Sequence, residues 1–349
     1  MNESLDLTVN RGSHVNRNPA ISIITPNYNT AAYIAETLDS VFAQTFTDYE
    51  LIVINDASPD SNKLATVLEP YRDRIIFIDK SKNEGTSATR NLAVKRARAQ
   101  VISFLDADDI WFPTYLEDLY GFLNTTGFDL VYADAETFFD GSVKKAYDFL
   151  PYNPDQGEVT RRMLIDGRCH ILPSGTLIRK SAFLDVGGFD PGVARTEDFD
   201  LWMRMLFAGK RFGYLRKILF KFRISPGSGS GDSVVRLERT RDIWHVLQRK
   251  LTFTDDENAI IAGHIAAADA GALRAKGRVY INERNWSRAK AVFSEASSKA
   301  DELGLPITHR LKMKAIIVML YIAPEVVRLW MRKLRADEIE YMPATDDSK

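Results

Sequence analysis

Aspartates that directly follow short apolar runs are the residues of this sequence best suited to chemistry. Three of the four apolar runs near the N-terminus end in such acids: Asp56, Asp79 and the segment 106–109. In Asp106-Ala107-Asp108, two carboxylates one residue apart can serve a hydroxyl ligand and a hard divalent cation that also binds diphosphate oxygens. The alternative is an N-cap, with Asp109 preceding a helix over 110–120. We favour the metal-site interpretation because a second acid ends a neighbouring strand.

The apolar runs themselves predict the elements that position these acids. The runs are β-branched, four or five residues long, and start 30, 24 and 26 residues apart: 21–24, 51–54, 75–78 and 101–105. Helical patterns occupy the intervals: 32–44, 61–71 and 86–98. Apolar strands that alternate with helices predict a doubly wound, mostly parallel, Rossmann-like α/β sheet. Ligands of such sheets bind beyond the carboxyl ends of the strands, where the aspartates lie.

The rest of the chain is less regular and then becomes helical. We expect further strands at 129–134, 174–179, 212–215 and 219–222, a hairpin at 138–142 and a helix at 198–207. The small, turn-forming residues of 225–233 predict a domain boundary near 233. The predicted domains are a loose tail, 1–18, an α/β catalytic domain, 19–233, an all-helical region, 234–335, and an acidic tail, 336–349.

Six motifs, in this order and with compatible spacing, resemble those of the family 2 glycosyltransferases over residues 19–225. They are IITPNYN at 23–29, ELIVINDAS at 50–58, NEGTSATRN at 83–91, FLDADD at 104–109, GGFD at 187–190 and TEDFDLW at 196–202. The resemblance implies the GT-A fold. It also implies transfer of a sugar from a nucleotide-diphosphate donor, with inversion at the anomeric carbon and assistance from Mn²⁺ or Mg²⁺.

The resemblance assigns four residues to the nucleotide. Thr25, Pro26 and Tyr28 match the segment beside the base and ribose, and the Tyr28 ring after a Pro-Asn turn suits a planar base. The alternative for Tyr28 is a core aromatic. Asp56 matches the carboxylate that accepts the ring N–H of the base, which favours a UDP or dTDP donor over a GDP donor.

Three more residues are assigned to the diphosphate, the sugar and the cation. Asp106 matches a sugar-binding carboxylate, and Asp108 matches the metal ligand. Arg90 matches a basic residue that approaches the donor phosphate or Asp106; the alternative is a solvated helix position. A cation held through Asp108 would stabilise the charge that grows on the leaving diphosphate.

The motif Thr196-Glu197-Asp198 matches the acidic centre that supplies the catalytic base. Inverting transfer needs a base that takes the proton of the acceptor hydroxyl as it attacks opposite the leaving group. The resemblance places this base at Asp198, with Glu197 orienting it or binding the acceptor. The alternative is that Asp198 caps a helix over 199–207. No covalent intermediate is needed, so the lone Cys169 is expected to be a core residue.

The chain departs from processive members of the family. It has no Gln-x-x-Arg-Trp after the acidic motif and no run of about 20 apolar residues. We therefore expect transfer of a single sugar to a glycan or a lipid-linked glycan, as in the synthesis of bacterial surface polysaccharides or glycoconjugates. Arg223 and the Gly/Ser run after it correspond either to a mobile loop over the donor or to an interdomain linker.

Two features of the helical region suggest packing partners. Small and apolar residues follow the spacing of one tetratricopeptide-like hairpin: Leu273, Gly277, Tyr280, Ala289, Phe293 and Ala296. An unrelated helical hairpin is the alternative. The segment 311–335 is predicted to be a basic amphipathic helix, which suits an anionic membrane surface, the protein core or a homodimer seam.

Composition narrows the class of protein. Lys and Arg number 46 against 47 Asp and Glu, a formal charge of −1, so no nucleic-acid partner is expected. A single cysteine fits a reducing compartment. Residues 1–18 lack the apolar core of an export signal. The expected location is the cytoplasm, with peripheral contact at the inner face of the membrane.

Two other readings of the acids have to be weighed. A nucleotidyltransferase also uses an Asp pair with Mg²⁺, but it would need a Gly-rich, basic loop after the first strand, where Pro26-Asn27-Tyr28 stands. A non-catalytic interaction protein could retain the fold. Intact acids at positions 56, 106, 108 and 198 count against that alternative.

Overall fold

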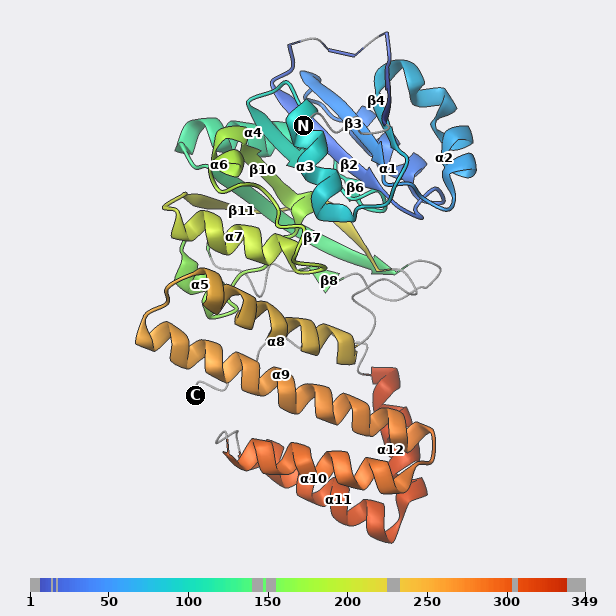
Figure 1. Cartoon of the computed structure of the whole chain (residues 1–349), viewed down its shortest axis with the longest axis vertical. Coiled ribbons are helices and arrows are strands. Elements are labelled where there is room, and N and C mark those ends of the chain that lie inside the picture. The colour runs from blue at the N-terminus through green and yellow to red at the C-terminus, as the bar shows by residue number, and fades with distance from the viewer. Residues whose placement is uncertain are drawn as a thin grey trace. The chain divides into compact units, whose positions relative to one another are not determined.

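The protein is described by a computed structural model over residues 7–13, 15–16, 18–139, 147–148, 155–224, 233–302 and 307–337. The chain divides into two compact units, Met1–Pro226 and Gly227–Lys349 (Figure 1). Their division lies in the small-residue run after strand β11. Each unit is described by itself.

The described part of the first unit holds one sheet of eleven strands. Nine of them follow the order β1-β4-β3-β2-β5-β10-β7-β11-β6. Strand β8 pairs with β7, and strand β9 pairs with β11. The strands are β1 Leu7–Arg11, β2 Ile21–Asn27, β3 Tyr49–Asn55, β4 Ile76–Lys80, β5 Val101–Phe104, β6 Ile110–Trp111, β7 Leu130–Phe139, β8 Tyr147–Asp148, β9 Gly157–Val159, β10 Thr176–Arg179 and β11 Phe212–Ile224. The block β4-β3-β2-β5 is parallel, which confirms the predicted sheet. Strand β10 enters antiparallel between β5 and β7.

Helices cover both faces of this sheet. They are α1 Ile34–Phe42, α2 Ser61–Leu68, α3 Thr86–Arg96, α4 Tyr115–Thr126, α5 Arg161–Ile165, α6 Lys180–Asp185 and α7 Glu197–Phe207, with 3-10 turns at Glu69–Arg74 and Pro173–Gly175. Alternate residues of β2 and β3, such as Ile23 and Val53, join the cluster that α1, α2 and α4 cover. Helix α3 packs against β2 and β3. Burial on both faces explains why these strands read as continuous apolar runs.

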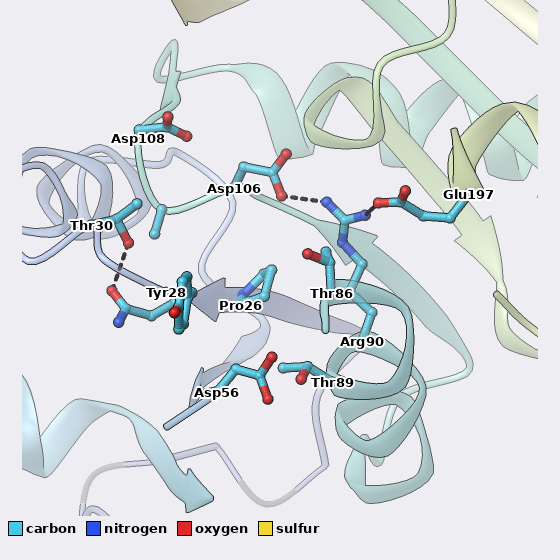
Figure 2. A pocket seen from close by; sticks show the side chains of 12 residues that line it. Pro26, Tyr28, Thr30, Asp56, Thr86, Thr89, Arg90, Asp106, Asp108 and Glu197 are labelled. Atoms are coloured by element: carbon cyan, nitrogen blue, oxygen red, sulfur yellow. Dashed lines mark hydrogen bonds and ion pairs between the residues drawn. The ribbon is translucent and has the colours of Figure 1, made fainter. Parts of the chain in front are cut away.

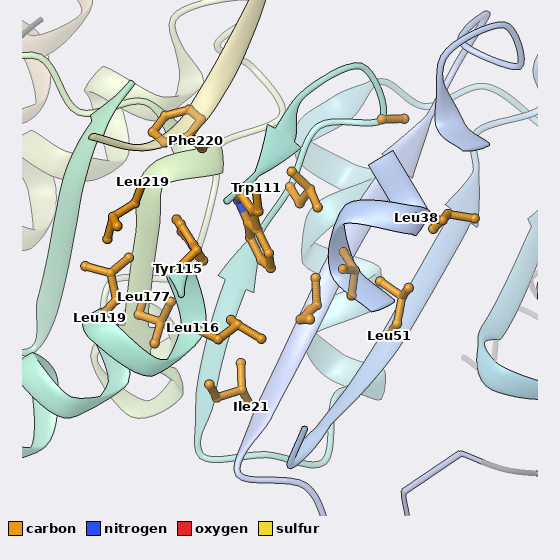
Figure 3. Close-up of a cluster of buried hydrophobic side chains, with 14 of the residues drawn as sticks. Ile21, Leu38, Leu51, Trp111, Tyr115, Leu116, Leu119, Leu177, Leu219 and Phe220 are labelled. Carbon is orange, nitrogen blue, oxygen red and sulfur yellow. The ribbon is translucent and has the colours of Figure 1, made fainter. Parts of the chain in front are cut away.

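A large apolar cluster of the first unit includes residues of the turn that follows β5. Trp111 and Tyr115 stack with ring centroids 4.0 Å apart, among Leu116, Leu119 and Phe220 (Figure 3). The Trp111 indole Nε1 donates to the carbonyl of Ser174 at 2.7 Å. Each such fully buried side chain contributes roughly 1.5–3 kcal/mol through apolar burial. The acidic turn at 106–109 therefore begins and ends in well-packed structure.

Several predicted elements need correction. Residues 7–11 lie in the predicted loose tail but form β1, an edge strand antiparallel to β4; its exposed side chains carry no apolar pattern. Strands predicted at 212–215 and 219–222 are one strand, β11, with register shifts between Leu215 and Phe220. The strand predicted over 174–179 begins at Thr176, after a 3-10 turn. The predicted hairpin at 138–142 extends beyond the described residues, because β7 is described only to Phe139.

The helix predicted over 110–120 is also displaced. Ile110 and Trp111 form β6 and pair with β11, and the helix α4 begins only at Tyr115. Asp109 is therefore not an N-cap. Its carboxylate Oδ1 instead accepts the backbone N–H of Arg223 at 3.0 Å.

The second unit is helical throughout its described residues. Its helices are α8 Ser233–Lys250, α9 Asp255–Asn282, α10 Trp286–Glu302, α11 Ile307–Ile322 and α12 Pro324–Asp337. Helices α9 and α10 pack against each other, and Gly277 faces the Phe293 ring. The single helix predicted over 311–335 is wrong: α11 ends at Ile322 and α12 starts at Pro324, because proline has no N–H to continue the ladder. No helix among the described residues is long and apolar enough to span a membrane.

Candidate active site

A pocket of about 260 Å³ opens at the carboxyl ends of β2, β3 and β5 (Figure 2). Seven predicted site residues line it: Pro26, Tyr28, Asp56, Arg90, Asp106, Asp108 and Glu197. Five further residues line it that the motif assignment did not single out: Asn27, Thr30, Thr86, Thr89 and Ala107. Thr25 and Asp198 are not among the lining residues. Thr25 is fully buried within β2, and its hydroxyl has no hydrogen-bond partner among the described residues.

The turn after β2 presents an aromatic ring to this pocket. Tyr28 is 52% exposed, so it is not the core aromatic of the alternative interpretation. Asn29 follows it in the left-handed conformation, with φ of 56°, which asparagine tolerates better than most residues. The Asn29 N–H donates to the Ser58 hydroxyl at 2.6 Å, and the Thr30 hydroxyl donates to the Asn27 amide oxygen at 2.7 Å. These bonds hold the ring beside the pocket.

Asp56 is a buried acceptor in the wall of the pocket. Its Oδ1 accepts from Lys80 Nζ at 2.5 Å and from the Glu84 N–H at 3.0 Å, and its Oδ2 accepts from the Gly85 N–H at 2.8 Å. Gly85 has φ of 84°, a conformation that glycine adopts without strain as it precedes α3. Lys80 was missed in the sequence, where it reads as an ordinary polar residue at a strand end. Charge-assisted bonds of this kind fix the carboxylate in one orientation.

Arg90 connects two acidic segments that lie far apart in the sequence. Its guanidinium donates to Asp106 Oδ1 at 2.5 Å and to Glu197 Oε1 at 3.2 Å (Figure 2). The side chain is only 3% exposed and lies beside the rings of Phe104 and Phe189. The alternative of a solvated helix residue is therefore wrong. Burial lowers the pKa of Arg90, but the two carboxylates raise it overall, so the group stays a cation.

The acidic turn is held in place by backbone contacts. The Asp106 N–H donates to the Ser174 hydroxyl at 3.0 Å, and Arg223 Nε donates to the Asp108 carbonyl at 2.9 Å. Arg223 lies within β11 and is buried, with its guanidinium also paired with Glu36 at 2.5 Å. The sequence suggested that Arg223 belongs to a loop or linker. The structure instead makes it a brace between β11, α1 and the acidic turn.

The carboxylates of this turn suit a divalent cation. Burial, and then the charge of Asp106, raise the pKa of Asp108 to about 6, and Asp108 forms no ion pair among the described residues. Negative charge concentrated at a pocket wall is stabilised by a cation. Within the described residues there is no group of three or more His, Cys, Asp or Glu side chains that could hold a metal alone. Two carboxylates completed by substrate phosphates are a common arrangement for Mg²⁺. The residues present therefore fit such an ion.

Asp198 lies in the first turn of α7, next to the pocket residue Glu197. Thr196 is the N-cap, so the alternative of Asp198 as the cap is wrong. The Asp198 Oδ1 accepts the N–H of Phe199 at 2.8 Å. Burial, followed by the charge of Glu197, raises the pKa of Asp198 to about 6. A carboxylate with this pKa is ionised at neutral pH and is more basic than an ordinary aspartate.

Known proteins share this sequence pattern and architecture. The family described as Glycosyl transferase family 2 matches residues 22–187. An uncharacterized glycosyltransferase of Rickettsia prowazekii is 30% identical over 239 residues, which cover 67% of this chain and 73% of that protein. TuaG of Bacillus subtilis, a putative teichuronic acid biosynthesis glycosyltransferase, is 26% identical over 247 residues, covering 67% of this chain and 90% of TuaG.

Solved structures resemble the chain over nearly its whole length. TarS 1–349 of S. aureus, in complex with UDP-GlcNAc, matches with a TM-score of 0.59 and 18% identity, covering 93% of this chain and 94% of that one. The mannosyltransferase PcManGT of Pyrobaculum calidifontis, in complex with GDP-Man and Mn²⁺, matches with a TM-score of 0.55 and 16% identity, covering 94% and 91%. At these identities the likeness concerns the fold.

The sheet order and the likeness to these solved structures thus define a protein of the GT-A fold, with an acidic pocket at its strand ends. With the family match and the Rickettsia relative, the assignment becomes specific: the chain belongs to the family 2 glycosyltransferases. This membership excludes the nucleotidyltransferase alternative. The roles of individual residues, the donor and the acceptor are proposals, which follow.

Proposed function

We propose that this enzyme transfers one sugar from a nucleotide-diphosphate donor to a hydroxyl acceptor, with inversion and with the help of Mn²⁺ or Mg²⁺. The observation that carries the proposal is the Arg90 bridge from Asp106 to Glu197. The bridge unites the acidic turn after β5 with the acidic start of α7 on the wall of one pocket. A donor bound against the turn would therefore present its anomeric carbon toward α7.

The other end of the pocket fits the nucleotide. A base can stack on the exposed Tyr28 ring while its ring N–H donates to Asp56, whose two oxygens are held by Lys80 and by backbone N–H groups. Uracil and thymine carry a ring N–H suited to this acceptor, so we favour a UDP or dTDP donor. Thr25 would contribute through the strand backbone only, because its side chain is buried away from the pocket.

Asp108 is the residue that would hold the divalent ion together with the donor diphosphate, and Asp106 would bind the donor sugar. Such an ion, when bound, supplies Lewis-acid stabilisation of charge on the leaving diphosphate. Arg90 keeps Asp106 oriented toward the sugar through the bond at 2.5 Å. Arg223 holds the Asp108 backbone, and so the direction of its carboxylate.

Asp198 takes the proton of the acceptor hydroxyl in this proposal. Its raised pKa of about 6 makes it a stronger base than ordinary aspartate while it remains ionised at neutral pH. The N–H of Phe199 holds one carboxylate oxygen and leaves the other for the hydroxyl. Glu197 orients this turn through Arg90. The hydroxyl then attacks opposite the leaving diphosphate, and the sugar configuration inverts.

The acceptor is proposed to be a growing surface polysaccharide or a lipid-linked glycan. Support comes from the relative TuaG, a putative teichuronic acid biosynthesis glycosyltransferase, and from the absence of the processive Gln-x-x-Arg-Trp motif. Because the Gln-x-x-Arg-Trp motif of processive enzymes is absent, we propose that the enzyme adds one sugar each time it binds an acceptor.

A thermal-shift screen with UDP-, dTDP- and GDP-sugars, with and without Mn²⁺, tests this function. A bound donor stabilises the fold by mass action, about 2.7 kcal/mol at a hundredfold excess over Kd. We expect stabilisation by a UDP- or dTDP-sugar that depends on Mn²⁺ and is lost in Asp108→Asn. Asp185→Asn, which removes an exposed carboxylate bound to Lys210, is the matched control. If the donor stabilises the protein without Mn²⁺, or still stabilises the Asp108→Asn variant, the assignment of Asp108 as the metal ligand is wrong.

A further inference from the structure

The last two helices of the second unit expose a concentration of apolar side chains. Of the thirteen large apolar residues that are most exposed in the described part of the chain, nine lie on α11 and α12. Isolated exposed apolar residues are normal on protein surfaces, whereas a contiguous group marks an interaction site. The group lies outside the catalytic pocket and has no role in the proposed transfer.

Helical spacing gathers the α11 members into one stripe. Ile307, Leu311, Val318 and Ile322 recur at intervals of four, seven and four residues, and are between 54% and 73% exposed. The opposite side of α11 is already used: Leu320 packs with Ile281 and Phe293, and Met313 packs with Ala296 and Ala300. A surface helix normally has a polar outer face. Here α11 is apolar on both sides.

Lysines border this stripe. At 3.6 residues per turn, Lys312 and Lys314 project from α11 on opposite edges of the stripe, and both are exposed. Long lysine side chains can run along apolar surface while the ammonium group reaches a polar layer. Each nearby acid is shared by two cations, so a net positive charge remains. Asp301 pairs with Lys314 at 3.0 Å and with Arg310 at 3.4 Å, and Glu325 pairs with Arg284 at 3.0 Å and with Arg328 at 2.7 Å. Over residues 307–337 the sequence has seven Lys and Arg residues against two acids.

We propose that the outer face of α11 and α12 binds the surface of an anionic lipid bilayer. The apolar stripe would enter the boundary between headgroups and acyl chains, with the bordering lysines at the phosphates. On α12, Val326 and Trp330 are further exposed apolar residues, at 54% and 49% exposed, and an indole suits this boundary. Neither helix can span a membrane, so the contact is peripheral.

Charge decides between a bilayer and a second copy of the chain. A two-fold contact places the same face of each protomer against the other, so two lysine-bordered, net positive surfaces would meet. Like charges across an interface disfavour association. Anionic headgroups provide the opposite charge along both edges of the stripe. The proposal needs no bound donor and no turnover, so it is tested independently of the proposed function.

Vesicle sedimentation of the full chain tests this inference. The probes are vesicles of phosphatidylcholine alone and of phosphatidylcholine with phosphatidylglycerol. We expect binding only to the anionic vesicles, and weakening by about tenfold or more when NaCl rises from about 50 to about 500 mM. The double variant Val318→Asp, Ile322→Asp should lose at least about tenfold in affinity. Val279→Asp, at an apolar residue of α9 that is 46% exposed, is the matched control and should bind as the wild type does.

Trp330 provides a second readout. Its emission should shift to the blue on binding anionic vesicles, and the shift should be absent in Trp330→Phe, which keeps an apolar ring. Thermal unfolding of each variant monitors folding. Equal binding to neutral and anionic vesicles, or unchanged binding of the double variant, would overturn the proposal. So would a chain that ignores vesicles and self-associates through Val318 in sedimentation velocity, which would assign the face to a second copy.

Discussion

The pH dependence of turnover gives the sharpest test of the acidic start of α7. If Asp198 is the base, kcat/KM depends on its ionised fraction. With a pKa of about 6, roughly one tenth of Asp198 is ionised at pH 5, so the rate should be about one tenth of its plateau near pH 8. On the acid side of the pH–rate profile, called the acid limb below, kcat/KM should follow the titration of a single group and fall about tenfold per pH unit below pH 6. An ordinary aspartate would lose almost nothing at pH 5.

Glu197→Gln is the informative perturbation. Burial is the first cause of the raised Asp198 pKa and the charge of Glu197 is the second. Removing the Glu197 charge lowers the pKa of Asp198. The change also frees the Arg90 cation from its second carboxylate, and the Arg90 charge lowers the pKa of Asp198 further. The limb should therefore move to lower pH, yet stay above 3.8, because the burial remains. The variant at pH 5 should keep more than one tenth of its own plateau.

The assay is release of the nucleotide diphosphate from the donor found in the screen, between pH 4.5 and pH 8.5 and at saturating Mn²⁺. Glu158→Gln, at an exposed carboxylate that pairs with Arg211, is the control and should leave the limb in place. An acid limb that does not move in Glu197→Gln refutes the assignment of the base. A limb that moves only with the Mn²⁺ concentration belongs to Asp108 instead, whose pKa is also about 6.

Three other predictions address the base, the brace and the second unit. Asp198→Asn should bind donor and Mn²⁺ as the wild type does but lose roughly 10² or more in turnover, and near-native turnover would move the base elsewhere. Arg223→Lys keeps the charge but loses the Nε bond at 2.9 Å, so Mn²⁺ titrations of the donor complex should show weaker affinity, and an unchanged affinity would make the brace merely structural. In α9, Gly277→Ala would place Cβ 2.5 Å from the Phe293 ring and should cost about 1–3 kcal/mol in chemical denaturation. Gly263→Ala, with open space around it, should instead stabilise by roughly 0.5–1 kcal/mol, and equal effects of the two changes would contradict the packing argument.

The sequence by itself determined the parallel block of the first unit's sheet and the edge of that sheet at which the candidate site lies. Strands buried on both faces leave continuous apolar runs, and the interval between runs reveals the helices. Because parallel strands end at the same edge, acids after the strands at 51–54 and 101–105 had to meet near one pocket. These properties are local or periodic. For that reason they can be read without knowledge of any contact.

The edge strand β1 and the irregular strand β11 were harder to predict from the sequence. Strand β1 is exposed along most of its length, so no apolar pattern distinguishes it from a tail. Its order depends on pairing with β4, 65 to 73 residues later in the chain, with Leu7 opposite Lys80 and Arg11 opposite Ile76. The bulge in β11 likewise depends on register against β7, and its residues read as a gap between two strands.

Only the tertiary structure decided which charges meet. Arg90 lies 107 residues from Glu197, yet one guanidinium binds both Glu197 and Asp106. Arg223 reaches Glu36, 187 residues away. On a helix or strand these arginines look like any solvated cation, because ion pairing depends on where two backbones pass each other. The residue types were visible in the sequence, but their pairing, burial and shifted pKa values arise from packing between distant segments.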